Sequence, residues 1–63
     1  MYKEYDHVRI VSSGITGIIV DKFQKDGRTL YTVESDKKGV AGGAGEKDSW
    51  KLFVCSDEEI ELI

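Results

Sequence analysis

The segment "KKGVAGGAGEKDSW", residues 37–50, comes nearest in this sequence to a phosphate-binding loop. A P-loop has the pattern Gly-x-x-x-x-Gly-Lys-Ser/Thr, in which backbone N–H groups surround the phosphate. Here the second glycine follows Gly39 one residue too late, at Gly45, and Glu46 comes next instead of lysine. A dinucleotide fingerprint also fails, because Asp48 stands where its third glycine belongs. We therefore expect a solvated, flexible connector.

His7 and Cys55 are the only histidine and the only cysteine of the chain. An intramolecular disulfide and a cysteine/histidine zinc cluster are both excluded. No nucleophile lies near His7 in the sequence, so we expect a surface or partly packed histidine. Acids that follow Cys55 would raise the pKa of its thiol, which is typical of a core or rim cysteine. We expect no catalytic residues, no cofactor and no metal, and hence no enzyme.

Four acids lie near the end of the chain, at Asp57, Glu58, Glu59 and Glu61. A calcium loop spaces its ligands and turns on a central glycine, which is missing here. Ser56 and Glu59 instead match a capping box, so we expect the acids to start a single helical or 3₁₀ turn and to add solubility.

Basic side chains alternate with aromatic ones around the Asp26-Gly27 pair, an arrangement that single-stranded nucleic acid uses for phosphate contacts and base stacking. The residues that would make such a nucleic-acid site are Lys22, Phe23, Lys25 and Arg28. The opposing interpretation is that these lysines protect a strand tip from edge pairing. Acids in the same region bring the local charge close to zero.

Length and charge limit the class of protein. The 63 residues make one domain, 1–63, with a formal net charge of −3, which opposes general attraction to phosphate backbones. The N-terminus lacks the apolar run of a signal peptide, and no apolar stretch is long enough for a membrane span. We therefore expect a cytoplasmic location and no membrane partner.

Short extended segments separated by turns run through the whole chain. Alternation with many β-branched residues predicts a strand over residues 6–13, and the apolar run 18–20 predicts a second strand that is covered on both faces or contains a bulge. Asp26-Gly27 is the strongest hairpin signal, and the strand should return over residues 30–34. "SWKLFVC" predicts a fourth strand and "IELI" a short fifth, with a helix over residues 57–63 as the rival interpretation.

Five strands without a long helix predict an all-β domain, and closure into a barrel would cover its edges. Gly17 would allow a close approach of strands. Trp50, Leu52 and Val54 share one side of the fourth strand, and Lys51, Phe53 and Cys55 share the other. The expected core residues are Val8, Ile10, Ile19, Val33, Leu52, Val54 and Ile60.

The stretch "VRIVSSGITGIIVD" resembles the first two strands of SH3-like small barrels, and of KOW-type modules in particular, through Gly14, Gly17 and Ile19. The ending "WKLFVCSDEEIELI" is similar to their strand, 3₁₀ turn and final strand, and also resembles small barrels common in bacterial and phage genomes. The resemblance implies a five-stranded SH3-like barrel with a short 3₁₀ turn before the last strand.

Aromatic residues are too many for the interior of so small a barrel, so some must reach the surface, where they anchor protein interfaces. We expect a non-catalytic module that binds another protein or its own copy through a face containing Tyr5, Tyr31 and Trp50. The alternative is a KOW-like, RNA-binding module that uses the basic hairpin. A small-ligand-sequestering oligomer is a further alternative.

Overall fold

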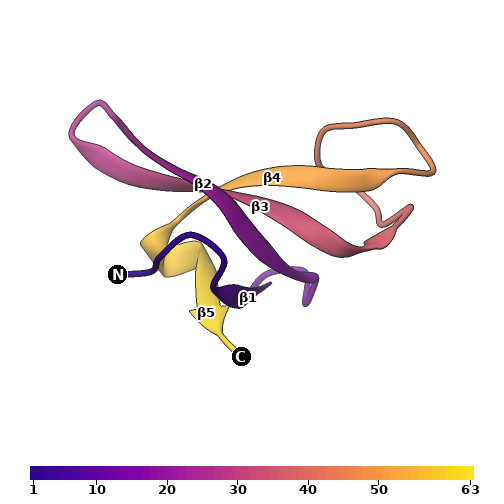
Figure 1. Cartoon of the computed structure of the whole chain (residues 1–63), viewed down its shortest axis with the longest axis horizontal. Helices are drawn as coiled ribbons and strands as arrows, with labels where there is room; N and C mark the ends of the chain where they lie inside the picture. Colours follow the sequence, from indigo (N-terminus) through magenta and orange to yellow (C-terminus); the bar gives the residue numbers. More distant parts are fainter.

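The computed structural model describes all residues, 1–63, as one antiparallel sheet of five strands in the order β4-β3-β2-β1-β5 (Figure 1). The all-β class and the count of five strands are confirmed. The only other regular element is a 3₁₀ turn, η1, between the last two strands. The bounds are β1 His7–Ile10, β2 Thr16–Lys25, β3 Arg28–Lys38, β4 Trp50–Ser56, η1 Asp57–Glu59 and β5 Ile60–Leu62.

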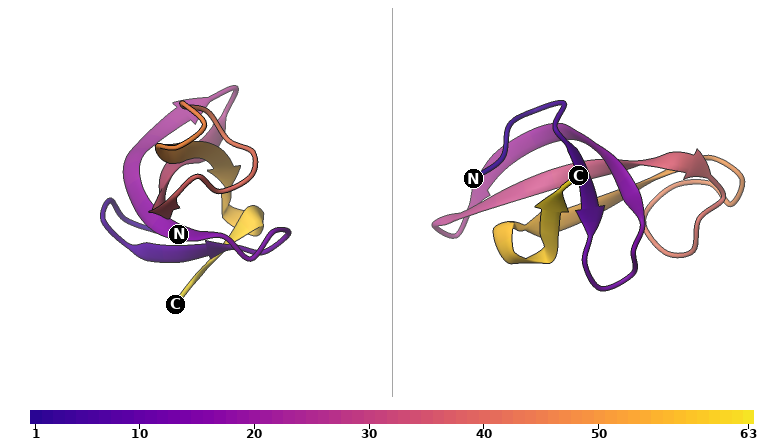
Figure 2. Two further views of the ribbon diagram at one scale, coloured as in Figure 1. Left: turned by 90° about the vertical axis from the view of Figure 1, so that its right-hand side faces the viewer. Right: turned by 90° about the horizontal axis from the view of Figure 1, so that it is seen from below.

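The sheet is strongly twisted and curls around the core, but its two edges do not pair (Figure 2). β4 and β5 form these edges and are joined through η1. Pairing therefore gives an open sheet and not a closed ring of strands. No helix in the structure is long and apolar enough to cross a membrane.

β1 ends at Ile10, three residues before the predicted end of that strand at Ser13. The reason is a turn in which the N–H of Gly14 donates to the carbonyl oxygen of Ile10 at 2.8 Å, with Gly14 at a φ of 78°. A left-handed backbone of this kind favours glycine.

Gly17 lies in the middle of the sheet, opposite Val8 on β1 and Ser35 on β3. A Cβ atom added at this position would lie 2.3 Å from the carbonyl oxygen of Glu34 and 2.8 Å from Cγ1 of Val33. The expectation that Gly17 allows close approach of strands is therefore confirmed.

A β-bulge at Val20 interrupts the pairing of β2 with β3, because Ile19 pairs with Val33 and Asp21 already pairs with Thr32. The bulge is one of the two alternatives that the apolar run 18–20 predicted. The alternation of the strand places Ile19 in the core and leaves Ile18 and Val20 more than a third exposed.

The predicted hairpin turn is confirmed, since Asp26 and Gly27 have φ values of 53° and 75° and join β2 directly to β3. Both values are left-handed, which is the requirement of a type I′ turn. β3 is longer than the predicted 30–34, because it begins at the turn and continues to Lys38.

The core agrees with five of the seven expected residues. Val8, Ile10, Ile19, Val33 and Ile60 are buried, together with Tyr31, which was not expected there, and Cys55, which was expected in the core or at its rim. The prediction that Leu52 and Val54 belong to the core is wrong, because their side chains are 39% and 59% exposed. The opposite side of β4 faces inward, with Lys51 and Cys55 buried and Phe53 packed against the core.

Lys51 can face inward because its ammonium leaves the interior and donates to the carbonyl oxygen of Gly42 at 3.3 Å. Its backbone N–H donates to the hydroxyl oxygen of Ser35 at 2.9 Å. A lysine stem covers apolar surface while the charged end reaches a polar group, so a lysine does not mark the solvent side of a strand.

The end of the chain follows the prediction of one 3₁₀ turn and a last strand, and the rival helix over residues 57–63 is absent. The backbone N–H of Ser56 donates to Oε1 of Glu59 at 2.7 Å. This hydrogen bond is the first cause of the lowered pKa of Glu59. The acids of this segment therefore begin a turn, as expected from the capping-box pattern.

Candidate interaction surface

The side of the sheet that faces away from the core carries apolar side chains on β2 and β4, with Glu34 and Thr32 of β3 between them. Residues opposite each other on neighbouring strands share a face, so the pairing defines rows across β2, β3 and β4. One row contains Ile18, Glu34 and Leu52. The next contains Thr32 and Val54, with the bulge at Val20 and Asp21 beside them. We call this side of the three strands the outer face.

Five large apolar side chains of the outer face are partly exposed. The exposed fractions are 38% for Ile18, 36% for Val20, 50% for Trp50, 39% for Leu52 and 59% for Val54. Single exposed apolar residues are ordinary, but several that share one side of a sheet mark a candidate surface for interaction. The structure has no pocket, so any contact made by this face is with an open surface.

Trp50 lies at one end of the outer face, opposite Lys38, after a register shift between β3 and β4. The ammonium of Lys38 is 4.4 Å from the centre of the indole ring. This is a cation–π contact, and Trp50 is 50% exposed beside it. Trp50 is therefore available at the surface, as expected.

Tyr31 does not belong to a surface, because it is fully buried. Its hydroxyl donates to Oδ1 of Asp57 at 2.7 Å and accepts from the backbone N–H of Tyr2 at 3.2 Å. The rings of Tyr2 and Tyr31 meet edge to face at 5.7 Å. Burial is the first cause of the raised pKa of Tyr31. The hydroxyl of Tyr31 therefore has its hydrogen-bond partners inside the protein. The prediction that Tyr31 lies on an exposed binding face is wrong.

Tyr5 is 76% exposed and lies beside β2, where its backbone N–H donates to the carbonyl oxygen of Ile19 at 2.7 Å. β4, with Trp50, lies across β3 from β2. Of the three residues predicted for one binding face, two are exposed, and they lie on opposite sides of β3.

The glycine-rich segment is attached to β4. Ala44 exchanges two backbone hydrogen bonds with Leu52, at 2.8 and 2.9 Å, and the N–H of Gly39 donates to Ser49 at 2.9 Å. Gly43 lies so close to β4 that an added Cβ would be 2.8 Å from the ring of Phe53. The segment 39–49, here called the edge loop, covers part of the β4 edge instead of being a free connector; its mobility stays a prediction.

The basic hairpin divides between the two faces of the sheet. Phe23 pairs with Leu30, and Lys25 pairs with Arg28 on the same face, whereas Lys22 pairs with Tyr31 on the other. Lys22, Lys25 and Arg28 are exposed, and Phe23 is partly buried. Three of the four residues predicted for nucleic-acid binding thus lie together.

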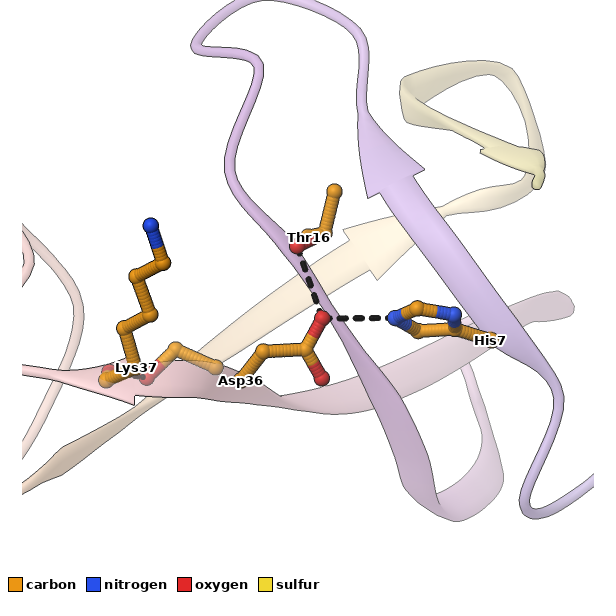
Figure 3. A network of polar contacts seen from close by, with 5 residues as sticks. His7, Thr16, Asp36 and Lys37 are labelled. Carbon is orange, nitrogen blue, oxygen red and sulfur yellow. Dashed lines mark hydrogen bonds and ion pairs between the residues drawn. The ribbon is translucent and has the colours of Figure 1, made fainter.

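A polar network connects β1, β2 and β3 at the other end of the sheet (Figure 3). Oδ2 of Asp36 lies 2.6 Å from Nε2 of His7 and accepts a hydrogen bond from the hydroxyl of Thr16 at 2.7 Å. The hydrogen bond with His7 is the first cause of the lowered pKa of Asp36. In a nucleophilic triad the hydroxyl would contact the imidazole, but here both groups contact the carboxylate. The network therefore joins strands.

Cys55 is a buried free thiol, and burial followed by the charge of Glu59 raises its pKa. A raised pKa disfavours the reactive thiolate. The structure contains no cluster of three or more metal-ligating side chains.

The geometry defines the chain as a small all-β domain, one curled sheet of five antiparallel strands with a partly apolar outer face. No protein-family model, curated protein or solved structure matches the chain.

Sequence reasoning missed Ile18, Val20, Leu52 and Val54 as surface residues. Two features of the sequence could have indicated them. The run 18–20 consists of three consecutive apolar residues, so a strand must place some of them on each face of the sheet. "WKLFVC" likewise has apolar residues on both sides of its strand.

Proposed function

We propose that the chain is a non-catalytic, cytoplasmic binding module that associates with another protein or with a second copy through its outer face. The observation that carries this proposal is the set of five partly exposed apolar residues on one side of the sheet, two on β2 and three on β4. Burial of apolar area drives protein association, and tryptophan is a frequent anchor of binding energy.

The proposal includes an SH3-like barrel as the fold. Support comes from the short strands, the tight β2–β3 hairpin and the one-turn η1 that precedes the last strand. The residues 8–21 and 50–63 that resemble such barrels lie in β1, β2, β4, η1 and β5.

Site-specific crosslinking in the cell that produces the protein tests this function. A photoreactive amino acid at Leu52, on the outer face, should give a discrete adduct with a protein or a second copy. The same amino acid at exposed Leu62, on β5, is the matched control and should not give that adduct. Identical adducts from both positions, or none from Leu52, would contradict the proposal.

RNA binding is the second candidate, and the specific observation in its favour is the common face of Phe23, Lys25 and Arg28. Stacking and phosphate contact would then occur side by side. If this candidate holds, single-stranded RNA binds more weakly as salt rises, and joint replacement of Lys22, Lys25 and Arg28 by alanine abolishes binding. Salt-independent binding, or no binding, removes this candidate.

A further inference from the structure

Beyond Leu52, the edge of β4 has one open position. The backbone groups of Leu52 point away from β3 and bond to Ala44. Directions alternate along an antiparallel strand, so the N–H and C=O of Val54 also point away from β3. Neither group makes a hydrogen bond to another part of the chain. The N–H of Ser56 is taken by Glu59. The open edge is therefore centred on Val54.

An open edge is a template for another strand, and proteins usually block it with charge, proline or a covering segment. Here the side chain at the centre of the open edge is a valine that is 59% exposed. The only cover is the edge loop, and it ends its pairing at Leu52.

We infer that β4 pairs antiparallel with β4 of a second copy, on a two-fold axis at Val54, and that the edge loop competes with this pairing. The inference rests on the proposed function and selects the second copy as the partner. A two-fold interface uses the same residues from both chains, so one open position on each chain supplies a donor and an acceptor for the other.

Charge complementarity favours the second copy. With Val54 on the axis, the beginning of β4 in one chain, where Lys38 lies over Trp50, approaches the acidic η1 turn of the other chain, and the same approach occurs twice. Opposite charges across an interface fix the register of two chains.

The edge loop occupies a position that the second copy needs. The same register places Ser56 of the second copy opposite Leu52, which is where Ala44 pairs in the monomer. Pairing within the chain and between chains therefore exclude each other at that residue. A dimer would also join two outer faces, so that Trp50, Leu52 and Val54 of one β4 strand lie beside the same three residues of the other.

Gly43 offers a way to displace the edge loop. A side chain at this position would meet the ring of Phe53 at 2.8 Å and the carbonyl oxygen of Leu52 at 2.9 Å. Gly43→Val should therefore move the edge loop away from β4. Gly14→Val is the matched control, since Gly14 has a similar left-handed φ, 78° against 70°, and nothing within 4 Å of the added atom.

Sedimentation velocity over a range of concentrations measures the outcome. We expect Gly43→Val to lower the dimer dissociation constant at least about tenfold relative to wild type and to Gly14→Val, because the Leu52 N–H of each chain becomes available to the Ser56 carbonyl oxygen of the other. Far-UV circular dichroism confirms that each variant keeps its sheet.

A second pair of variants tests the axis. In the Gly43→Val background, Val54→Lys puts two like charges on the axis and should restore the monomer. Leu62→Lys in the same background should leave the dimer intact, and it changes a side chain of equal exposure, 59%.

Amide exchange of the wild-type chain provides a measurement that does not depend on a variant that folds. The Val54 amide should exchange fast in dilute solution and more slowly as concentration rises. A Gly43→Val chain that is folded and as monomeric as wild type, or a Val54 exchange rate independent of concentration, overturns the inference. If a Leu52 crosslink to a different protein persists in that case, the proposed function survives; if both experiments fail, neither does.

Discussion

Gly17 is the position at which the smallest change should have the largest effect on stability. Gly17→Ala adds one methyl group, which would lie 2.3 Å from the carbonyl oxygen of Glu34 and 2.8 Å from Cγ1 of Val33. Both neighbours belong to the centre of β3, so relief requires β2 and β3 to separate where each also holds another strand. The φ of Gly17 is not left-handed, and the cost is therefore steric.

The magnitude follows from overpacking, which costs about 1 to 3 kcal/mol for added methyl or methylene groups in a well-packed interior. The core of a domain of this length rarely supplies more than about 3 to 5 kcal/mol of stability. A loss of about 2 kcal/mol would lower the melting temperature by about 8 to 16 °C. With a urea m-value of about 1 kcal/mol per molar, the midpoint would fall by about 2 M.

Urea unfolding followed by far-UV circular dichroism measures this loss. The double variant Gly17→Ala/Val33→Ala removes Cγ1 of Val33 but leaves the closer contact with the backbone oxygen, so it should not regain stability. Were Gly17→Ala to unfold within about 0.5 kcal/mol of wild type, the close approach would not be a constraint, and the reasoning would be wrong.

Two further predictions concern polar contacts. Tyr31→Phe removes the hydroxyl that bonds to Asp57 and Tyr2, and it should lower the free energy of unfolding, measured in urea, by about 1 to 2 kcal/mol. The control is Tyr5→Phe at an exposed tyrosine, which should change this free energy by less than about 0.5 kcal/mol. Equal effects of the two variants would contradict the prediction. The pKa of Asp36 is lowered on folding, so its charged form stabilises the protein above the ordinary aspartate pKa of about 3.9, and this contribution is lost as pH falls through the lower folded value. Urea midpoints from pH 6 to pH 2 should therefore fall less steeply for Asp36→Asn than for wild type; parallel curves would refute the coupling.

The sequence predicted the fold class well because turns and caps are local signals. Asp26-Gly27 and the Ser56–Glu59 pair each fix their own turn through residues within a few positions. The alternation around Val8 and Ile10 likewise identified their burial.

The inward side of β4 could not be read from its own residues, because both sides of "WKLFVC" are apolar apart from one lysine. The choice depends on distant partners: Gly42 receives the Lys51 ammonium, and Ser35 receives the Lys51 N–H. The wrong choice placed Leu52 and Val54 inside and so hid two of the five residues of the candidate site.

The burial of Tyr31 also depends on distant residues. Its hydroxyl meets Asp57 and Tyr2, which are 26 and 29 positions away in the sequence. The surface role of Trp50 could be predicted, since a large ring at a strand end has few neighbours. The attachment of the edge loop could not, because Ala44 pairs through its backbone and its side chain carries no signal.

The bulge at Val20 makes one site in the sheet tolerant of changes in chain length. At this point β2 has one residue, Val20, without a pairing partner on β3. Deletion of Val20 would therefore leave Ile19 paired with Val33 and Asp21 paired with Thr32. Deletion of a residue elsewhere in β2 would exchange the inward and outward side chains of everything beyond it. Natural variants that lose a codon within this strand should therefore lose it at Val20.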